Sequence, residues 1–189
     1  MGLVPKTYLP NYSEFYERRW FSSSEDLQQK TVEPWEIGLE GETSIPVGRD
    51  LLFVIGDGAV VGIEICEDMH SPIPTSAHLA LNGANVIVNP AASSEQAGKR
   101  NQRRNRVLAN SVAGTCIYAY ASAGFTESTQ DLVYSGHSII AENGQILKMN
   151  ENQIDTGYMI LQDCDLGRIR ANRRKSQNYE LASDNWYVT

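Results

Sequence analysis

The stretch that decides the fold runs from residue 59 to residue 68 and reads Ala59-Val60-Val61-Gly62-Ile63-Glu64-Ile65-Cys66-Glu67-Asp68. Its apolar first part predicts a strand over residues 59–65, and the acidic residues after Cys66 predict a polar turn. A helix over residues 74–83 and a short buried strand over residues 86–88 are expected to follow. This order is typical of α/β folds, which gather catalytic residues at the carboxyl ends of strands.

The residues on either side continue the alternation of strands and helices. Further strands are expected over residues 51–55, 116–120, 133–141, 145–148 and 158–161, and further helices over residues 12–19, 99–113 and 166–175. The Asn143-Gly144 pair predicts a hairpin turn. Residues 21–49 predict a long irregular loop, and residues 176–189 a polar tail. Together these elements indicate an α/β fold with a mixed sheet.

The bulk properties indicate one soluble domain. The chain has 189 residues, of which 41% are hydrophobic and 21% charged, as in ordinary globular proteins. No apolar run approaches the ~18 residues that span a bilayer, and the first residues lack the pattern of a secretory signal. Three widely spaced cysteines indicate neither a disulfide framework nor a zinc site. We therefore expect a single domain over residues 1–189, in the cytoplasm, with no membrane partner and no metal.

The basic residues are concentrated in two segments, although the net charge is −7. Ten of the 16 Lys and Arg residues fall within residues 99–106 and 168–175. Clustered cations can neutralise phosphates, so a nucleic-acid partner is one interpretation. Neither segment contains an aromatic residue for base stacking, and the overall acidity would repel a polyanion. We therefore expect two solvated basic helices and no nucleic-acid partner.

Cys66 is the first candidate for chemistry, because it ends a strand and begins a polar turn. That position is typical of a nucleophile elbow, in which backbone N–H groups can hold an oxyanion. A small buried hydrophobe is the alternative for any free cysteine, and we expect that role for Cys116 and Cys164. The acidic neighbours of Cys66 would raise its pKa, so a thiolate there needs a nearby cation or base. His70 follows too closely along the chain for us to expect it to face the thiol.

Lys6 is the second candidate. Leu3-Val4-Pro5 predicts the last residues of a strand, which places Lys6 at its end. Prolines at positions 5 and 10 restrict the backbone on both sides of the lysine, and this suits a positioned side chain. An ordinary surface lysine is the alternative interpretation.

Several motifs, taken together, resemble a known family. They are Lys6-Thr7-Tyr8-Leu9-Pro10-Asn11-Tyr12, Glu14-Phe15-Tyr16-Glu17, Gly62-Ile63-Glu64-Ile65-Cys66-Glu67-Asp68, Pro72-Ile73-Pro74, Asn89-Pro90-Ala91-Ala92-Ser93, Tyr118-Ala119-Tyr120-Ala121-Ser122-Ala123-Gly124, Glu127-Ser128-Thr129-Gln130-Asp131-Leu132-Val133 and Gly136-His137-Ser138-Ile139-Ile140-Ala141-Glu142-Asn143-Gly144. They resemble the nitrilase (carbon–nitrogen hydrolase) superfamily, and more narrowly the glutaminase domain of glutamine-dependent NAD synthetases. The resemblance extends from Lys6 to about Lys175.

The resemblance implies a four-layer αββα sandwich and a Cys-Glu-Lys catalytic triad. Cys66 would attack the side-chain amide of glutamine, form a thioester and release ammonia, and water would then release glutamate. Lys6 would stabilise the oxyanion together with the backbone N–H of Glu67. No cofactor is implied for this domain, because ATP and Mg²⁺ would belong to a synthetase module.

The resemblance also implies a glutamine-binding site. Its positions fall on Tyr12, Glu67, Ser93 and Lys99. The last is usually arginine in the family, so two-pronged binding of a carboxylate is not expected from it. Glu14 matches a structural glutamate that some members place beside the triad.

The chain departs from the family pattern in one respect. The family's general-base glutamate lies upstream of the lysine, and only five residues precede Lys6 here. We therefore expect a sandwich that is incomplete at the N-terminus, and glutaminase activity reduced by roughly 10²–10⁴-fold. An unpaired sheet edge would then favour association, so a homo-oligomer is expected. The sequence contains no Ser-Gly-Gly pyrophosphatase loop, so no synthetase domain is expected in these residues.

Two other functions fit the same residues. One is a stand-alone amidase of the superfamily that acts on another carboxamide. The other is a non-catalytic subunit that completes its sheet with a separate polypeptide carrying the glutamate.

Overall fold

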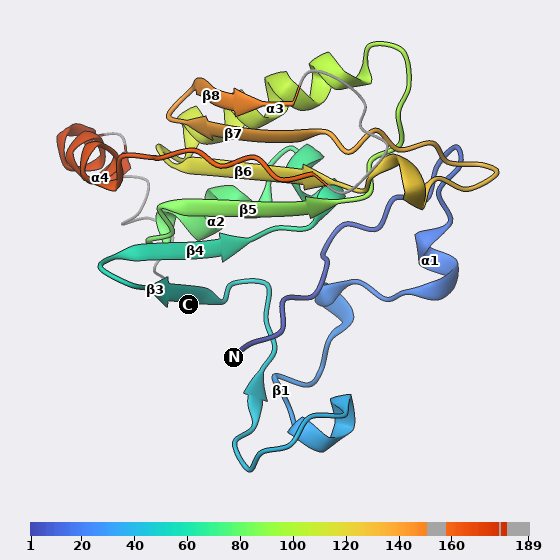
Figure 1. Ribbon diagram of the computed structural model, residues 1–189. Helices are drawn as coiled ribbons and strands as arrows, with labels where there is room; N and C mark the ends of the chain where they lie inside the picture. Colours follow the sequence, from blue (N-terminus) through green and yellow to red (C-terminus); the bar gives the residue numbers. More distant parts are fainter. Residues whose placement is uncertain (151–157, 178, 181–189) are drawn as a thin grey trace.

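A mixed six-stranded sheet forms the centre of the molecule (Figure 1). The computed structural model describes residues 1–150, 158–177 and 179–180. The strand order is β3-β4-β5-β6-β7-β8. Their bounds are β3 Leu52–Ile55, β4 Ala59–Ile63, β5 Val86–Ala91, β6 Ile117–Ser122, β7 Ser138–Glu142 and β8 Gln145–Met149. The pairs β4–β5 and β5–β6 are parallel and the others antiparallel, so the predicted mixed sheet is confirmed.

Two helices cover one face of this sheet, α2 (Thr75–Leu81) and α3 (Lys99–Ala113), which lie behind it in Figure 1. The other helices are α1 (Glu17–Trp20), which lies beside the sheet, and α4 (Leu166–Lys175), at the amino end of β5 and β6. Short 3₁₀ turns span Ser24–Asp26, Pro34–Ile37, Cys66–His70 and Phe125–Glu127, and a two-stranded ribbon pairs β1 (Thr31–Val32) with β2 (Ile45–Pro46). The described residues thus contain one large sheet and one helical layer, which account for one αβ half of the expected αββα sandwich.

The core lies between the sheet and these two helices. Alternate strand residues point toward the helices, and among them Ile87, Tyr118 and Ile139 are fully buried. Gly62 in β4 has a packing role, because a Cβ there would lie 3.0 Å from the Cβ of Leu79 in α2. α2 therefore packs closely against β4, the strand that leads to Cys66.

Most of the predicted elements are confirmed, and the helix over residues 99–113 has the predicted bounds. The strand predicted over residues 158–161 is wrong, since these residues form no strand. Pairing needs a free neighbouring strand as well as apolar side chains, and here the carbonyl of Leu161 accepts a hydrogen bond from a side chain, Lys148 Nζ, at 3.1 Å.

Three smaller predictions also need correction. Residues 133–137 precede β7 instead of belonging to it, and Leu3 forms only an isolated bridge with Val47. The helix predicted over residues 12–19 forms only at residues 17–20. Residues 177, 179 and 180 of the predicted tail are helical, whereas residues 178 and 181–189 lie outside the described residues.

Candidate active site

Cys66 lies where β4 ends and begins a 3₁₀ turn, in the position that the sequence predicts for a nucleophile. Its φ of +51° is in the left-handed region, which a residue with a Cβ adopts only at a cost of about 1–2 kcal/mol. Asn89 in the next strand stabilises this conformation: its Oδ1 accepts a hydrogen bond from the Cys66 N–H at 3.0 Å. The hydrogen bond from the Cys66 backbone to Asn89 therefore holds the residue, and with it the thiol, at the carboxyl end of the sheet.

Asp68 joins the segment of Lys6 to the turn of Cys66. Its Oδ1 accepts hydrogen bonds from the N–H groups of Thr7, at 3.2 Å, and Tyr8, at 2.8 Å, and its Oδ2 accepts one from Ile65 at 3.0 Å. The side chain is buried, at 1% exposure. Sequence reasoning treated this residue only as a neighbouring negative charge, whereas it holds together two segments about 60 residues apart.

The electrostatic environment of Cys66 has opposing parts. Burial raises the pKa of the thiol, while a hydrogen bond from the Ala92 backbone and the charge of Lys6 lower it. The carboxylates of Glu67 and Glu17 act in the raising direction. Burial is the largest of these influences, so the pKa of the thiol is raised overall and the charge of Lys6 offsets only part of the rise.

Glu17 is a site residue that sequence reasoning missed. It accepts a hydrogen bond from Lys6 Nζ at 2.5 Å, and both side chains are largely shielded from solvent. Glu14, which the resemblance places beside the triad, contacts other residues: its Oε1 accepts hydrogen bonds from Ser94 Oγ at 2.8 Å and from Gln96 Nε2 at 3.0 Å. The carboxylate beside Lys6 in this structure is thus Glu17, and Glu14 contacts the segment that leads to Lys99.

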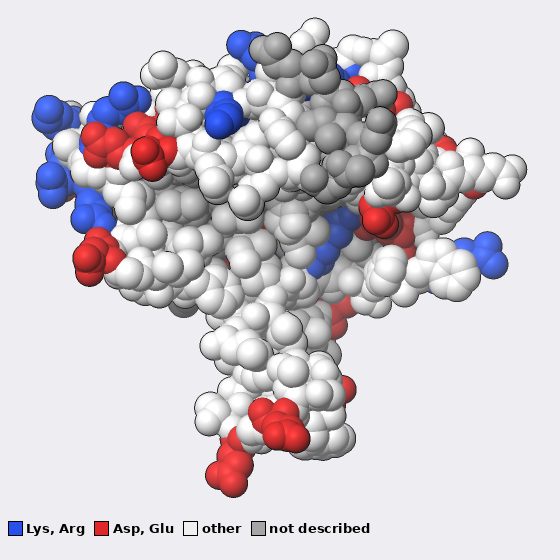
Figure 2. Space-filling view, viewed as in Figure 1, with Lys and Arg blue, Asp and Glu red and all other residues white. Residues whose placement is uncertain are grey.

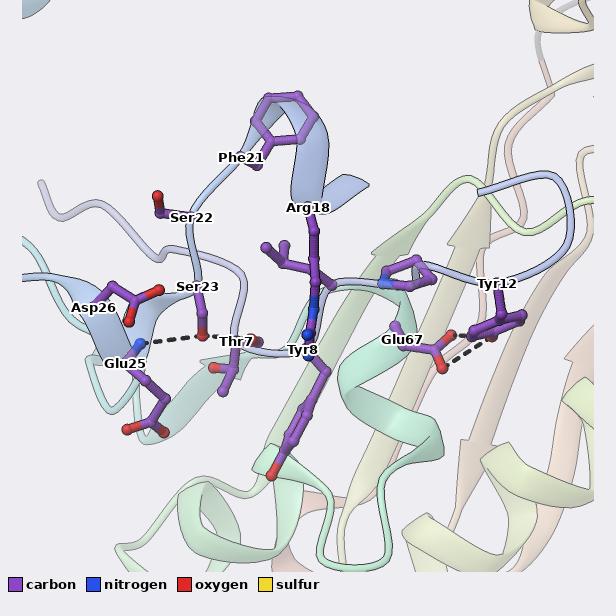
Figure 3. A pocket seen from close by; sticks show the side chains of 12 residues that line it. Thr7, Tyr8, Tyr12, Arg18, Phe21, Ser22, Ser23, Glu25, Asp26 and Glu67 are labelled. Carbon is purple, nitrogen blue, oxygen red and sulfur yellow. Dashed lines mark hydrogen bonds between the residues drawn. The ribbon is translucent and has the colours of Figure 1, made fainter. Parts of the chain in front are cut away.

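Tyr12 and Glu67 face each other at one end of a pocket of about 670 Å³ (Figure 3). The Tyr12 hydroxyl lies 3.0 Å from both carboxylate oxygens of Glu67. Burial and this hydrogen bond raise the pKa of Tyr12 to about 12, so the phenol remains a donor at neutral pH. Tyr8, Arg18 and Phe21 also line the pocket. The contact places two of the predicted glutamine-binding residues beside the Cys66 turn.

Ser93 and Lys99 lie between β5 and the start of α3. Ser93 is buried, and Arg103 Nη1 lies 3.5 Å from its hydroxyl. Lys99 Nζ donates to Ser94 Oγ at 2.9 Å and lies 5.6 Å from the centre of the Phe15 ring. A chain of polar contacts therefore joins Lys99, Ser94 and Glu14.

The basic segments have mainly structural contacts. Arg103 in the first is 1% exposed and donates to His137 Nδ1 at 3.1 Å and to the carbonyl of Ser94 at 3.2 Å. In the second, Arg173 donates to the carbonyls of Ala84, Gly114 and Thr115. Figure 2 shows Lys and Arg side chains over α4, where Arg168 also pairs with Glu142 at 3.1 Å. These contacts supply a reason for the clusters other than binding phosphate.

The other two cysteines differ from each other. Cys116 is fully buried in the core, as predicted. Cys164 is only partly buried and precedes α4 outside any strand, so the prediction of a core residue is wrong there. No helix in the described part of the chain is long and apolar enough to cross a membrane.

Comparison with known proteins agrees with this architecture. A family model described as carbon-nitrogen hydrolase matches residues 2–174. The chain therefore belongs to the carbon–nitrogen hydrolase family, and the resemblance to the nitrilase superfamily is confirmed.

Within this family, the chain is similar to glutamine-dependent NAD(+) synthetases. The chain is 41% identical over 177 residues to the glutamine-dependent NAD(+) synthetase of Mycobacterium leprae, an alignment that covers 92% of this chain and 25% of that protein. The structure of a glutamine-dependent NAD(+) synthetase from Cytophaga hutchinsonii superimposes with a TM-score of 0.63 at 29% identity, over 80% of this chain and 23% of that one. Saccharomyces cerevisiae Nit3, of the nitrilase superfamily, shares the fold, with a TM-score of 0.56 at 20% identity over 74% of this chain and 47% of its own. The chain thus spans about a quarter of the length of its NAD synthetase relatives.

Proposed function

We propose that this chain hydrolyses the side-chain amide of glutamine, with Cys66 as the nucleophile, and supplies the ammonia to NAD synthesis. The observation that carries the proposal is the clamp of Asp68, which holds the Lys6 segment against the turn of Cys66. A cation and a cysteine at a strand end are components that amide hydrolysis through a thioester requires.

The chemistry is the one that the family resemblance implies for these residues. The Cys66 thiolate forms a bond to the δ-carbon of glutamine, and the carbonyl oxygen becomes an oxyanion. Lys6 and the backbone N–H of Glu67 stabilise that charge. When the C–N bond breaks, the nitrogen takes up the proton that the thiol lost on forming the thiolate, and it leaves as ammonia. Water then attacks the thioester, which gives glutamate and restores the thiol.

The general base of this reaction is not assigned to any of the described residues. Glu17 faces Lys6 and lowers the net positive charge there, whereas the family resemblance assigns the base to a glutamate upstream of the lysine. The first attack on a reactive glutamine analogue does not need the hydrolytic step, so it tests the nucleophile alone.

Glutamine would be held at its two charged groups. Glu67, with Tyr12 as a hydrogen-bond donor, offers a carboxylate to the α-ammonium group. Lys99, which donates a hydrogen bond to Ser94 Oγ, offers a cation to the α-carboxylate. Because an ammonium group binds a carboxylate through a single point charge, recognition at Lys99 depends on its neighbours more than it would for an arginine.

The test is the intact mass of the chain after incubation with a diazo-ketone analogue of glutamine. We expect a single adduct, lost in Cys66→Ala and kept in the matched variant Cys164→Ala. Excess glutamine should protect Cys66, whereas other small carboxamides should not. Protection by another amide would favour the stand-alone amidase, and a free thiol that never reacts with the analogue would contradict the proposal.

A further inference from the structure

A buried chain of hydrogen bonds leads from the backbone of Cys66 to Glu64. The N–H of Cys66 donates to Asn89 Oδ1 at 3.0 Å, and Asn89 Nδ2 donates to the Tyr118 hydroxyl at 3.1 Å. The Tyr118 hydroxyl donates to Glu64 Oε1. On the far side, Glu64 Oε2 accepts a hydrogen bond from the N–H of Ser76 at 2.7 Å. Glu64, Asn89 and Tyr118 are each 0% exposed, so solvent takes no part in the chain.

The direction of every bond in this chain is fixed by its two ends. A backbone N–H can only donate, so the Asn89 atom that faces Cys66 must be the oxygen. The Asn89 amide group then donates to Tyr118, and the Tyr118 proton must point to Glu64. At the other end the N–H of Ser76 also donates. Donors therefore approach Glu64 from both sides, and only a group that accepts at both oxygens completes the chain.

We propose that Glu64 is a positioning residue for the nucleophile, because its carboxylate sets the direction of the hydrogen bonds that hold Cys66 in its left-handed conformation. The inference rests on the proposed role of Cys66 and names a residue that does not touch the substrate. Asn89 is the link that contacts Cys66 directly: besides accepting from its N–H, it donates to its carbonyl at 3.5 Å. Without these two hydrogen bonds, the φ of +51° would relax toward the negative values that most residues adopt, and the sulfur would move away from Lys6.

Glu64→Gln tests the direction of the hydrogen bonds without changing the size of the side chain. Glutamine has the same size, but it accepts at one end and donates at the other. If its oxygen faces Ser76, its amide group opposes the Tyr118 proton. Relief then requires either that Tyr118 turns its proton toward its other side-chain partner, Asn110, or that Tyr118 and Asn89 both reverse. The reversed Asn89 would present its own N–H groups to the N–H of Cys66. In that case two donors face each other at Cys66 as a result of the change at Glu64. Without the Tyr118 hydroxyl, the change at Glu64 should no longer affect Cys66.

The experiment is a double-mutant cycle on residues 1–189, read by the rate at which iodoacetamide alkylates Cys66 at pH 7. Peptide mass spectrometry separates Cys66 from the other cysteines. We expect Glu64→Gln to slow alkylation roughly tenfold in the wild-type background and less than about threefold in the Tyr118→Phe background. Glu64→Asp keeps two acceptors and should slow it less than Glu64→Gln. Equal factors in both backgrounds, or no effect of Glu64→Gln, would overturn the proposal.

A measurement on the unmodified chain covers the case in which a variant fails to fold. A scalar coupling through the hydrogen bond, between the nitrogen of Cys66 and the side-chain carbonyl carbon of Asn89, should be detectable by NMR. Its absence would overturn the proposal whatever the variants do. Failure of the glutamine proposal gives a different result: the diazo-ketone analogue would not label Cys66, whereas the coupling and the alkylation cycle would remain as described.

Discussion

Replacement of Asp68 by asparagine should loosen the site and lower stability with little change of shape. The carboxylate accepts three backbone hydrogen bonds, two from the Lys6 segment and one from Ile65. Asparagine offers one oxygen in place of two. If that oxygen keeps Thr7 and Tyr8, its amide group opposes the N–H of Ile65, and in the reverse orientation two bonds are lost instead of one.

The magnitude follows from the burial of the group. Loss of one charge-assisted hydrogen bond, with a buried N–H left opposite a donor, costs about 2–3 kcal/mol. For a chain of 189 residues this corresponds to a fall in Tm of roughly 4–12 °C. Labelling of Cys66 by the diazo-ketone analogue should also slow, because the Lys6 segment is no longer held against the Cys66 turn.

Urea and thermal unfolding, followed by circular dichroism, give the change in the free energy of unfolding. The matched control is Asp163→Asn, an exposed position at which we expect a change within about 0.5 kcal/mol. If Asp68→Asn unfolded with the wild-type midpoint and labelled at the wild-type rate, the clamp would not be what joins the two segments.

Three further predictions concern charge, pH and the sheet edge. Lys6→Met should raise the pKa of the Cys66 thiol and slow its alkylation at pH 7 by about tenfold, as measured from the pH dependence of the rate. Burial, then Arg100 and Arg103, lower the pKa of His137 to about 4. The stabilisation that neutral His137 contributes is therefore present above about pH 6.5 and is lost as the pH falls toward 4. Across this window, the free energy of unfolding of His137→Gln should depend less on pH than that of the wild type. Val54 is 75% exposed on the edge strand β3, so Val54→Lys should reduce concentration-dependent association in light scattering, and Val133→Lys, away from that edge, should not.

The sequence was most informative where local pattern and tertiary packing agree. The strand before Cys66 is apolar, and the helix over residues 99–113 is long, so both could be predicted with the correct type. The position of the cysteine at a strand end also follows from this pattern, although its φ of +51° does not. At residues 158–161 the apolar pattern predicted a strand that does not form, because nothing in the sequence shows whether a partner strand is free.

The two glutamates after Lys6 show why the site could only partly be predicted. A continuous helix over residues 12–19 would place Glu14 and Glu17 one turn apart on the same face, and either could then serve the lysine. The chain instead turns at Ser13, whose φ is +51°, and the helix begins only at Glu17. Glu14 is thereby directed to Ser94 and Glu17 to Lys6. The choice depends on one backbone angle that has no signature in the sequence.

The same separation of roles explains how a cysteine can act among so many acids. Glu64 and Asp68 flank Cys66 in sequence, but each carboxyl group is hydrogen-bonded to partners of its own: Glu64 accepts from Ser76 and Tyr118, and Asp68 accepts from three backbone N–H groups. The carboxylates that raise the pKa of the thiol are Glu67, which is paired with Tyr12, and Glu17, which is paired with Lys6. Each acid around the thiol therefore has a partner of its own. Because the Lys6 cation and the Ala92 N–H both lower the pKa of Cys66, binding of a glutamine ammonium group by Glu67 would remove part of the opposing charge, and the thiol should become more reactive when its substrate is bound.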